Sequence, residues 1–160
     1  MISDIYLNIG SNSGDSRAFI ARAVAALRSA FPECPLRTSG EVLSEPWGFI
    51  SVNMFINIGV VISVTRESDW TADDLEALLA TIKRTEKTIS AMPHRAPDGS
   101  YSDRELDIDI IAVDEIEYSS NTLTIPHPHM AERHFVLQPM TELAPHWRHP
   151  RTGLTCAQMQ

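Results

Sequence analysis

Polar and hydrophobic residues alternate strictly from Glu105 to Ile110, within the stretch 104–111. Side chains of an extended strand point to its two faces in turn, so this pattern places the apolar residues on one face and both Asp107 and Asp109 on the other. Two such positions lie roughly 7 Å apart, so their carboxylates can converge on a hard cation such as Mg²⁺. The same pattern also fits a half-buried strand whose aspartates face water.

The hydrophobic pattern of the whole chain predicts the order β-α-β-β-α-β. One helix is expected to begin at Asp15 or Ser16 and to stop before Pro32, and another to begin at the N-cap residue Thr71 and to reach Ile89. Strands are expected at residues 2–9, 36–43, 55–64 and 104–111. Loops are expected at residues 44–49 and 90–103, a hairpin-like piece at 115–124 and broken helix at 130–143.

This order indicates an α+β fold of the ferredoxin-like type, in which helices pack on one face of an antiparallel sheet. The residues after the last strand are expected to form a C-terminal extension. The sequence shows no internal repeat and no linker, so residues 1–160 are expected to form a single domain.

Composition narrows the functional classes. Hydrophobic residues make up 43% of the chain and charged residues 21%, which is typical of a globular domain with its own core. The most apolar run, residues 56–64, is too short to span a bilayer, and Cys34 and Cys156 are not in metal-ligand spacing. We therefore expect a cytoplasmic, monomeric protein with reduced thiols and no membrane association.

The formal net charge of −8 argues against general binding of nucleic acid or anionic membranes. Four basic residues nevertheless lie close together with a single acid, Glu86, among them; they are Lys83, Arg84, Lys87 and Arg95. Such a run fits either a solvated helix face or a local site for an anionic substrate.

Several aromatic and amide residues lie in loops or at strand ends, where a flat heterocycle could be held by stacking and by hydrogen bonds. The candidates are Trp47, Phe49, Phe55, Asn57, Tyr101 and Phe135. Taken alone, Phe55 and Phe135 are more often core residues than ligand-binding residues. Asn57 lies in an apolar strand, so backbone or ligand has to satisfy its amide. A zinc site at His127, His129 and His134 is a further alternative, which the prolines around His127 disfavour.

Several collinear stretches together resemble the 6-hydroxymethyl-7,8-dihydropterin pyrophosphokinase family. The strongest are the Arg-x-x-Asp-x-Asp-Ile pattern that starts at Arg104 and the Pro-His-x-x-Met-x-x-Arg-x-Phe pattern that starts at Pro126. Weaker stretches are Ile9-Gly10-Ser11-Asn12, Ser44-Glu45-Pro46-Trp47-Gly48 and Phe55-Ile56-Asn57. The resemblance covers most of the chain and implies a ferredoxin-like fold.

The resemblance also implies an activity, the Mg²⁺-dependent transfer of pyrophosphate from ATP to the pterin alcohol. It implies that Asp107 and Asp109 bind two Mg²⁺ ions and that Arg104 takes part in catalysis with them. The pterin would be held by Ser44, Glu45, Trp47, Phe55, Asn57, Phe135, Asn12 and Tyr101. ATP would be held by Lys83, Glu86, Arg95, Arg104, Ile110, His127 and Arg133.

Two departures from the family pattern bear on the nucleotide side. Ser90-Ala91 stands where the family has a Gly-Arg pair, so Arg95, Lys83 or Lys87 would have to take over the triphosphate, and Pro128 follows His127 in place of an aromatic residue. A non-catalytic pterin- or nucleotide-binding regulator is the alternative from another functional class. A metal-dependent hydrolase is a third reading, which lacks an evident water-activating base.

Overall fold

The computed structural model describes residues 1–49, 51, 53–90, 97–98 and 103–160. The central sheet is formed by β1 (Ile2–Ser11), β2 (Leu36–Thr38), β3 (Val42–Ser44), β4 (Phe55–Thr65) and β5 (Asp107–Val113). The helices are α1 (Ser16–Ala30), α2 (Ala72–Ile89), α3 (His134–Leu143) and α4 (Cys156–Met159), with a 3-10 turn η1 (Met130–Glu132). Strands β6 (Tyr118–Ser119) and β7 (Thr124–Ile125) form a small separate hairpin. None of the helices described is long and apolar enough to cross a membrane.

The sheet is antiparallel throughout its described pairs, in the order β2-β4-β1-β5, and β3 also pairs with β4. Strands β1 and β4 pair along their whole length, from Ile2 opposite Thr65 to Ser11 opposite Ile56. The mixed helix and antiparallel-sheet architecture predicted from the sequence is therefore confirmed.

Both predicted helix starts are confirmed by their caps. The Asp15 carboxylate accepts from the Ala18 amide at 3.1 Å and opens α1. Thr71 and Asp74 form a reciprocal capping box at the start of α2, in which each side chain accepts from the other residue's backbone N–H.

Two predicted strands differ in extent from those observed. The strand expected at residues 36–43 is two strands, because residues 39–41 lie opposite only two residues of β4. The Ser39 backbone N–H donates to the Gly59 carbonyl at 3.0 Å, and its hydroxyl accepts from the Gly59 amide at 2.8 Å. The strand expected from Arg104 begins at Asp107, because the Arg104 backbone bonds to Asn12 instead, at 2.8 and 3.0 Å.

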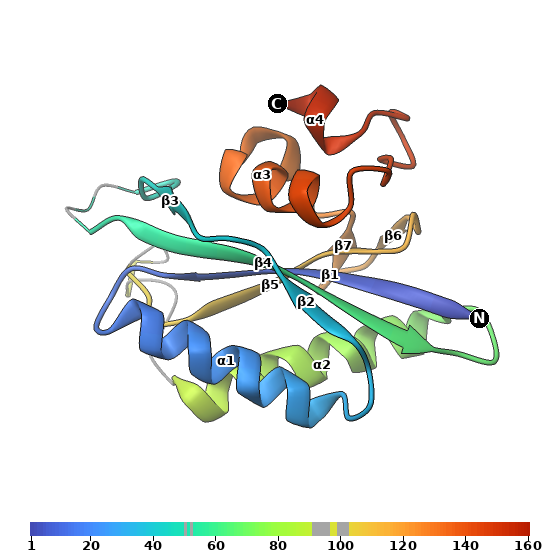
Figure 1. The fold of residues 1–160 in the computed structure, drawn as a ribbon, viewed down its shortest axis with the longest axis horizontal. Helices are drawn as coiled ribbons and strands as arrows, with labels where there is room; N and C mark the ends of the chain where they lie inside the picture. The colour runs from blue at the N-terminus through green and yellow to red at the C-terminus, as the bar shows by residue number, and fades with distance from the viewer. Residues whose placement is uncertain (50, 52, 91–96, 99–102) are drawn as a thin grey trace.

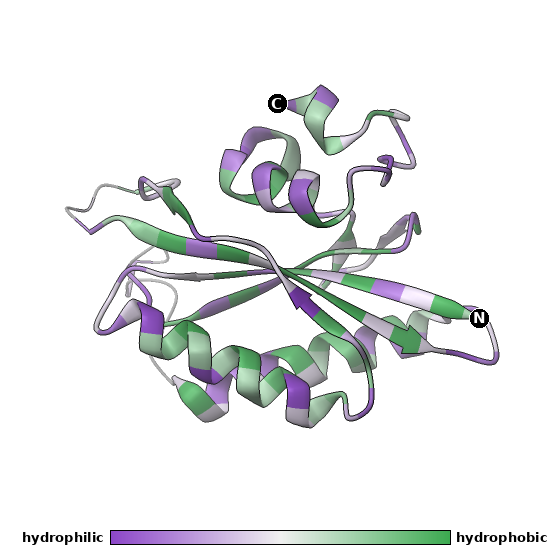
Figure 2. Cartoon of the chain, viewed as in Figure 1, coloured by the Kyte–Doolittle hydropathy of each residue, from purple (hydrophilic) through white to green (hydrophobic). Residues whose placement is uncertain are grey.

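Helices cover both faces of the sheet (Figure 1), which corrects the prediction that they pack on one face. Alternate residues of β1, β4 and β5 pack against α1 and α2, and these include Ile9, Ile58 and Ile108. Others face α3 and its neighbours, where Tyr6 and Val61 join a second core around Trp147. Figure 2 shows the hydrophobic positions concentrated along the central strands, between the two helical layers.

A β-bulge in β5 interrupts the alternation of that strand. Ala112 lies opposite Tyr6 and Ile110 opposite Leu7, so Ile111 is the extra residue. Ile110 still faces the core of α1 and α2, as Ile108 does. Because of the extra residue, Ile111 and Ala112 both face α3.

Candidate functional site

The floor of the candidate site is a set of neighbouring positions on three strands. Asn8 lies opposite Asp109, and Gly10 lies opposite both Asp107 and Asn57. These residues alternate with core residues that face α1 and α2, so they point to the opposite side of the sheet. Helix α3 packs over the apolar part of that same face, and the polar end remains beside it as a cleft.

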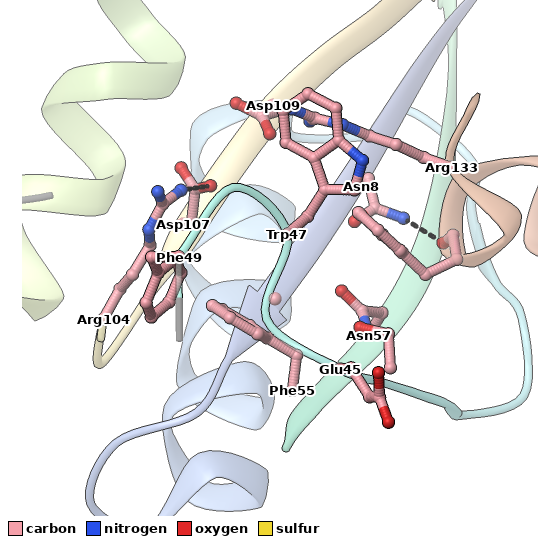
Figure 3. Close-up of a pocket in the computed structure, with 13 residues that line it drawn as sticks. Asn8, Glu45, Trp47, Phe49, Phe55, Asn57, Arg104, Asp107, Asp109 and Arg133 are labelled. Carbon is pink, nitrogen blue, oxygen red and sulfur yellow. Dashed lines mark hydrogen bonds and ion pairs between the residues drawn. The ribbon is translucent and has the colours of Figure 1, made fainter. Parts of the chain in front are cut away.

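Thirteen of the described residues line the cleft, and Figure 3 shows the labelled side chains reaching it from the strands, the segment after β3 and the start of α3. They are Asn8, Gly10, Ser44, Glu45, Trp47, Phe49, Phe55, Asn57, Arg104, Asp107, Asp109, Arg133 and Phe135. The cleft is narrow, with a cavity volume of about 50 Å³.

The two aspartates form a charged pair at one end of the cleft. Burial, together with the nearby Asp107 carboxylate, raises the pKa of Asp109 to about 6, although Lys83, Arg133 and Arg104 act in the opposite direction. The Asp107 carboxylate lies 2.5 Å from Arg104 Nη1 and 4.0 Å from Lys83 Nζ. A site that concentrates negative charge on two hard oxygen donors in this way is suited to cations.

Arg133 is a second cation of the cleft, and it is held by rings. Its side chain is 9% exposed, and its guanidinium carbon lies 4.2 Å above the Trp47 ring and 5.8 Å from the Phe135 ring. Its Nε atom is buried with no hydrogen-bond partner among the described residues. A buried guanidinium with an unused donor is poised for an anionic ligand, because leaving that donor unpaired costs free energy.

The other end of the cleft is aromatic and amide-rich. Phe49 packs edge-on against Phe55, with ring centroids 6.2 Å apart. The Asn8 amide donates to the Phe135 carbonyl at 2.8 Å and so fixes the start of α3 against β1. Asn57 is 2% exposed and donates to the Val42 carbonyl and the Ser44 hydroxyl, at 3.1 and 2.8 Å. The Val42 backbone and the Ser44 side chain therefore satisfy the amide of Asn57, for which the sequence alone predicted no particular partner.

Most residues predicted for the site lie in this one cleft, although they are far apart in sequence. They are Ser44, Glu45, Trp47, Phe55, Asn57, Arg104, Asp107, Asp109, Arg133 and Phe135. Gly10 and Asn8 line the cleft but were not predicted as site residues. Asn8 carried a usable signal, because it is an amide inside an apolar strand like Asn57.

The other predicted residues are not among those that line the cleft. Asn12 braces the segment before β5, since its amide donates to Asp103 at 2.9 Å. Lys83 and Glu86 lie on α2 at the outer edge of β5, and the Ile110 side chain packs in the core of α1 and α2. His127 lines a separate hollow next to the β6–β7 hairpin. Arg95 and Tyr101 lie outside the described residues.

The residues of the zinc alternative have other contacts. His129 lies 5.1 Å from the Trp47 ring and 6.0 Å from the His127 ring, whereas the His134 ring packs edge-on against Phe135. Within the described part of the chain, no three His, Cys, Asp or Glu side chains gather as a metal-binding group.

Comparison with known proteins places the chain among pterin-pathway enzymes. The model of the 7,8-dihydro-6-hydroxymethylpterin-pyrophosphokinase family matches residues 6–145. A 2-amino-4-hydroxy-6-hydroxymethyldihydropteridine pyrophosphokinase of Porphyromonas gingivalis is 32% identical over 147 residues, which cover 91% of this chain and 93% of that protein. The enzyme of the same name from Methylorubrum extorquens is 31% identical over 140 residues, covering 88% and 82% of the two chains.

Solved structures share the fold. A structure of HPPK-DHPS in complex with substrates superposes with a TM-score of 0.69 at 13% identity, over 98% of this chain and 42% of that one. A Plasmodium falciparum HPPK-DHPS structure gives a TM-score of 0.68 at 13% identity, over 99% and 45% of the two chains. The chain therefore spans less than half the length of these solved proteins.

Proposed function

The chain belongs to the 7,8-dihydro-6-hydroxymethylpterin-pyrophosphokinase family, and we propose that its cleft transfers pyrophosphate from ATP to 6-hydroxymethyl-7,8-dihydropterin. The products are AMP and the pterin diphosphate, an intermediate of folate biosynthesis. The observation that carries this conclusion is the division of one cleft into an aromatic, amide-rich half and a half with paired carboxylates and arginines.

The aromatic half suits the pterin. Phe55 and Phe135 offer ring faces for stacking, and Asn57 and Ser44 offer polar groups for the edge of the heterocycle. Glu45, Trp47 and Phe49 close this half from the segment after β3. We place Asn12 and Tyr101 as further pterin-side residues on the family resemblance alone.

The charged half suits the triphosphate. Arg133 offers a buried donor without a described partner, and Arg104 lies against Asp107 at the opposite wall. Lys83, Glu86, Ile110, His127 and Arg95 complete the proposed nucleotide side, again on the family resemblance. Arginine and lysine side chains here would neutralise phosphate oxygens, which is the main requirement of phosphoryl-type transfer.

The residues at the floor also fit Mg²⁺. Asp107 and Asp109 project from one face of β5 as two hard oxygen donors, and their mutual repulsion is relieved by a cation. We propose that these two side chains hold the Mg²⁺ ions that accompany ATP. When bound, such ions neutralise phosphate charge and help to align the attacking hydroxyl with the β-phosphorus.

The chain itself contributes orientation and exclusion of water. The aromatic half would fix the pterin so that its hydroxymethyl group points toward the aspartates, and Arg104 and Arg133 would hold the phosphates on either side. Transfers of this kind depend on positioning and charge stabilisation more than on a strong base. Trp47 would shield the reacting groups from water.

We further propose that the fold is ferredoxin-like and that the chain acts as a single-domain monomer. The order β2-β4-β1-β5, with antiparallel neighbours and α1 and α2 on one face, supports the ferredoxin-like assignment. A cytoplasmic location, where ATP is available, stays a prediction.

The test is AMP formation from ATP, with 6-hydroxymethyl-7,8-dihydropterin and Mg²⁺ present or omitted. The native chain should form AMP only when both are present. Asp109→Asn should lower the rate by at least about 100-fold, because a metal ligand is lost. Glu67→Gln, the same chemical change at an exposed position, should keep the native rate. No AMP from the native chain, with pterin still bound, would instead support the non-catalytic regulator.

A further inference from the structure

The outer edge of β5 is closed by side chains from α2. In the described sheet β5 is the last strand beyond β1, so its outward backbone groups need partners from elsewhere. The Ile108 amide donates to Glu86 Oε2 at 2.7 Å, and Lys83 Nζ donates to the Ile108 carbonyl at 3.0 Å. The two side chains thus satisfy both outward groups of one residue, as a neighbouring strand would.

These side chains also contact each other. Lys83 and Glu86 are one helical turn apart, and Lys83 Nζ lies 3.4 Å from Glu86 Oε2. The Glu86 side chain is 6% exposed and that of Lys83 38%. A buried carboxylate is costly unless it is paired and hydrogen-bonded, so the contact to Ile108 is a substantial part of what holds Glu86 there.

The position of Ile108 gives this contact its significance. Ile108 lies between the two aspartates, so its N–H belongs to the peptide unit that starts at Asp107 and its C=O to the unit that leads to Asp109. Glu86 holds the first peptide unit and Lys83 the second. Rotation of either unit would turn the carboxylate attached to it, because backbone dihedrals set the direction of each side chain.

We propose that Lys83 and Glu86 are positioning residues, which fix the backbone of β5 at Ile108 and thereby aim the carboxylates of Asp107 and Asp109 into the cleft. This inference rests on the proposed function for its catalytic consequence. It assigns Lys83 and Glu86 a role through the strand edge, in place of the direct contact with ATP that the family resemblance implies for them. A misplacement of about 1 Å at a reacting centre can cost roughly 100-fold in rate, so such a pair would affect turnover.

Lys83 has a second contact that fits this role. Its ammonium lies 4.0 Å from Asp107 Oδ1, so one cation touches both the strand backbone and the carboxylate to be positioned. Burial opposes the charge of Lys83, but the carboxylates of Asp109, Asp107 and Glu86 together outweigh it and raise the pKa of Lys83.

Paired variants test the proposal. Lys83→Met removes the donor to the Ile108 carbonyl, whereas Lys83→Arg keeps a donor. Glu86→Ala removes the acceptor for the Ile108 amide, whereas Glu86→Gln keeps an acceptor. Arg28→Met, at an exposed position of α1, controls for the loss of one positive charge. The melting temperature of each variant should confirm that it is folded before the other measurements are compared.

The first readout is amide hydrogen exchange of Ile108 in the ligand-free protein, relative to the central amides of β1. Exchange should become about tenfold faster in Glu86→Ala and stay near the native rate in Glu86→Gln, because the glutamine oxygen can still accept. Unchanged exchange in a folded Glu86→Ala variant would overturn the proposal. This readout needs no substrate, so it stands even if the chain forms no AMP.

The second readout separates kcat from the KM for ATP. For Lys83→Met and Glu86→Ala we expect kcat to fall about tenfold with KM within about twofold, since positioning acts on the reacting geometry. Arg28→Met should keep the native kcat, and Lys83→Arg and Glu86→Gln should each lose less kcat than Lys83→Met and Glu86→Ala. A KM that rises tenfold with kcat unchanged would overturn the proposal, because it would place these side chains on the nucleotide.

Discussion

Trp47 joins the two halves of the cleft through a single side chain. Its indole lies 4.2 Å from the Arg133 guanidinium carbon and 5.1 Å from the His129 ring. In Figure 3 it extends from the segment after β3 toward Arg133 and Asp109. Trp47 therefore closes the proposed pterin half of the cleft and also orients Arg133, a cation of the proposed phosphate half.

Substitution of Trp47 should weaken use of the nucleotide. A cation–π contact of this kind is worth about 1–2 kcal/mol when it is shielded from water, so Trp47→Ala should lower kcat/KM for ATP by about tenfold. Trp47→Phe, which keeps a smaller ring, should lose less. Steady-state kinetics at saturating pterin would measure this. Equal values for Trp47→Ala and the native enzyme would show that the stacking does not support Arg133.

His127 is neutral in the folded chain near physiological pH. Burial, reinforced by Arg133 and His129, lowers its pKa from 6.5 to about 4. Between these two pH values the unfolded chain binds a proton at this position and the folded chain does not. The free energy of unfolding should therefore fall as the pH drops through that window.

Substitution of His127 by asparagine should remove this contribution to the pH dependence of stability. The native chain should lose about 1–3 kcal/mol of stability between pH 6.5 and pH 4 through His127, and the variant should lack this part. Urea unfolding at several pH values would measure the difference. His146→Asn, at an exposed position, controls for the loss of one imidazole. The same pH profile for His127→Asn and the native chain would contradict the assignment.

Single residues differ in how far the sequence reveals their place. Strand alternation was sufficient to predict that Asp107 and Asp109 share a face, because period two depends only on the local backbone. It could not show that Gly10 lies between Asp107 and Asn57, since that neighbourhood depends on the register of three strands. Neither could it show the tryptophan–arginine stack, which joins residues 86 positions apart.

Helix α3 packs closely against strand β4 at Gly59. A Cβ atom added there would lie 2.7 Å from Pro139 Cβ and 3.2 Å from Leu143 Cδ1. Both neighbours belong to α3, so the glycine allows the helix to pack directly on the strand. This contact covers the sheet face next to the cleft and so sets the cleft's boundary.

Gly59→Ala should destabilise the protein by about 1–3 kcal/mol, because the added methyl group overpacks the contact between helix and strand. Gly40→Ala provides the comparison, since its Cβ would lie at an ordinary 3.7 Å from Glu142 Oε1. Chemical denaturation would measure both. A Gly59→Ala variant as stable as Gly40→Ala would show that α3 does not pack on β4 as described.

Element boundaries were predictable where local chemistry sets them. The helix starts at Asp15 and Thr71 follow from side chains that cap backbone amides within three residues. The break between β2 and β3 depends instead on the Ser39 hydroxyl and Gly59, which pair across 20 positions. The bulge at Ile111 likewise depends on pairing with β1 and was not foreseeable from alternation.

At the scale of the molecule, two apolar cores surround a polar strip of the sheet. The first core lies under α1 and α2 and the second under α3, and the strip with the aspartates lies beside the second. The sequence predicted broken helix at residues 130–143 but not the face of the sheet against which α3 packs. Its placement therefore needed the structure, whereas the helix and antiparallel-sheet class did not.

The polar strip should cost stability in the absence of ligands. Asp109 is buried and close to Asp107, which makes its charged form unfavourable. Asp109→Asn should therefore raise the free energy of unfolding by about 1–2 kcal/mol at pH 7.5 with metal chelated, while activity is lost. Glu67→Gln should stay within about 0.5 kcal/mol of the native chain. A destabilised Asp109→Asn variant would contradict the proposed repulsion.

We propose that one cleft holds both substrates, with the metal at Asp107 and Asp109. A crystal structure with Mn²⁺ in place of Mg²⁺, a non-hydrolysable ATP analogue and 6-hydroxymethyl-7,8-dihydropterin would test this. We expect anomalous Mn²⁺ density on the carboxylates of Asp107 and Asp109, with the pterin between Phe55 and Phe135. Mn²⁺ bound elsewhere, or a pterin outside this cleft, would contradict it.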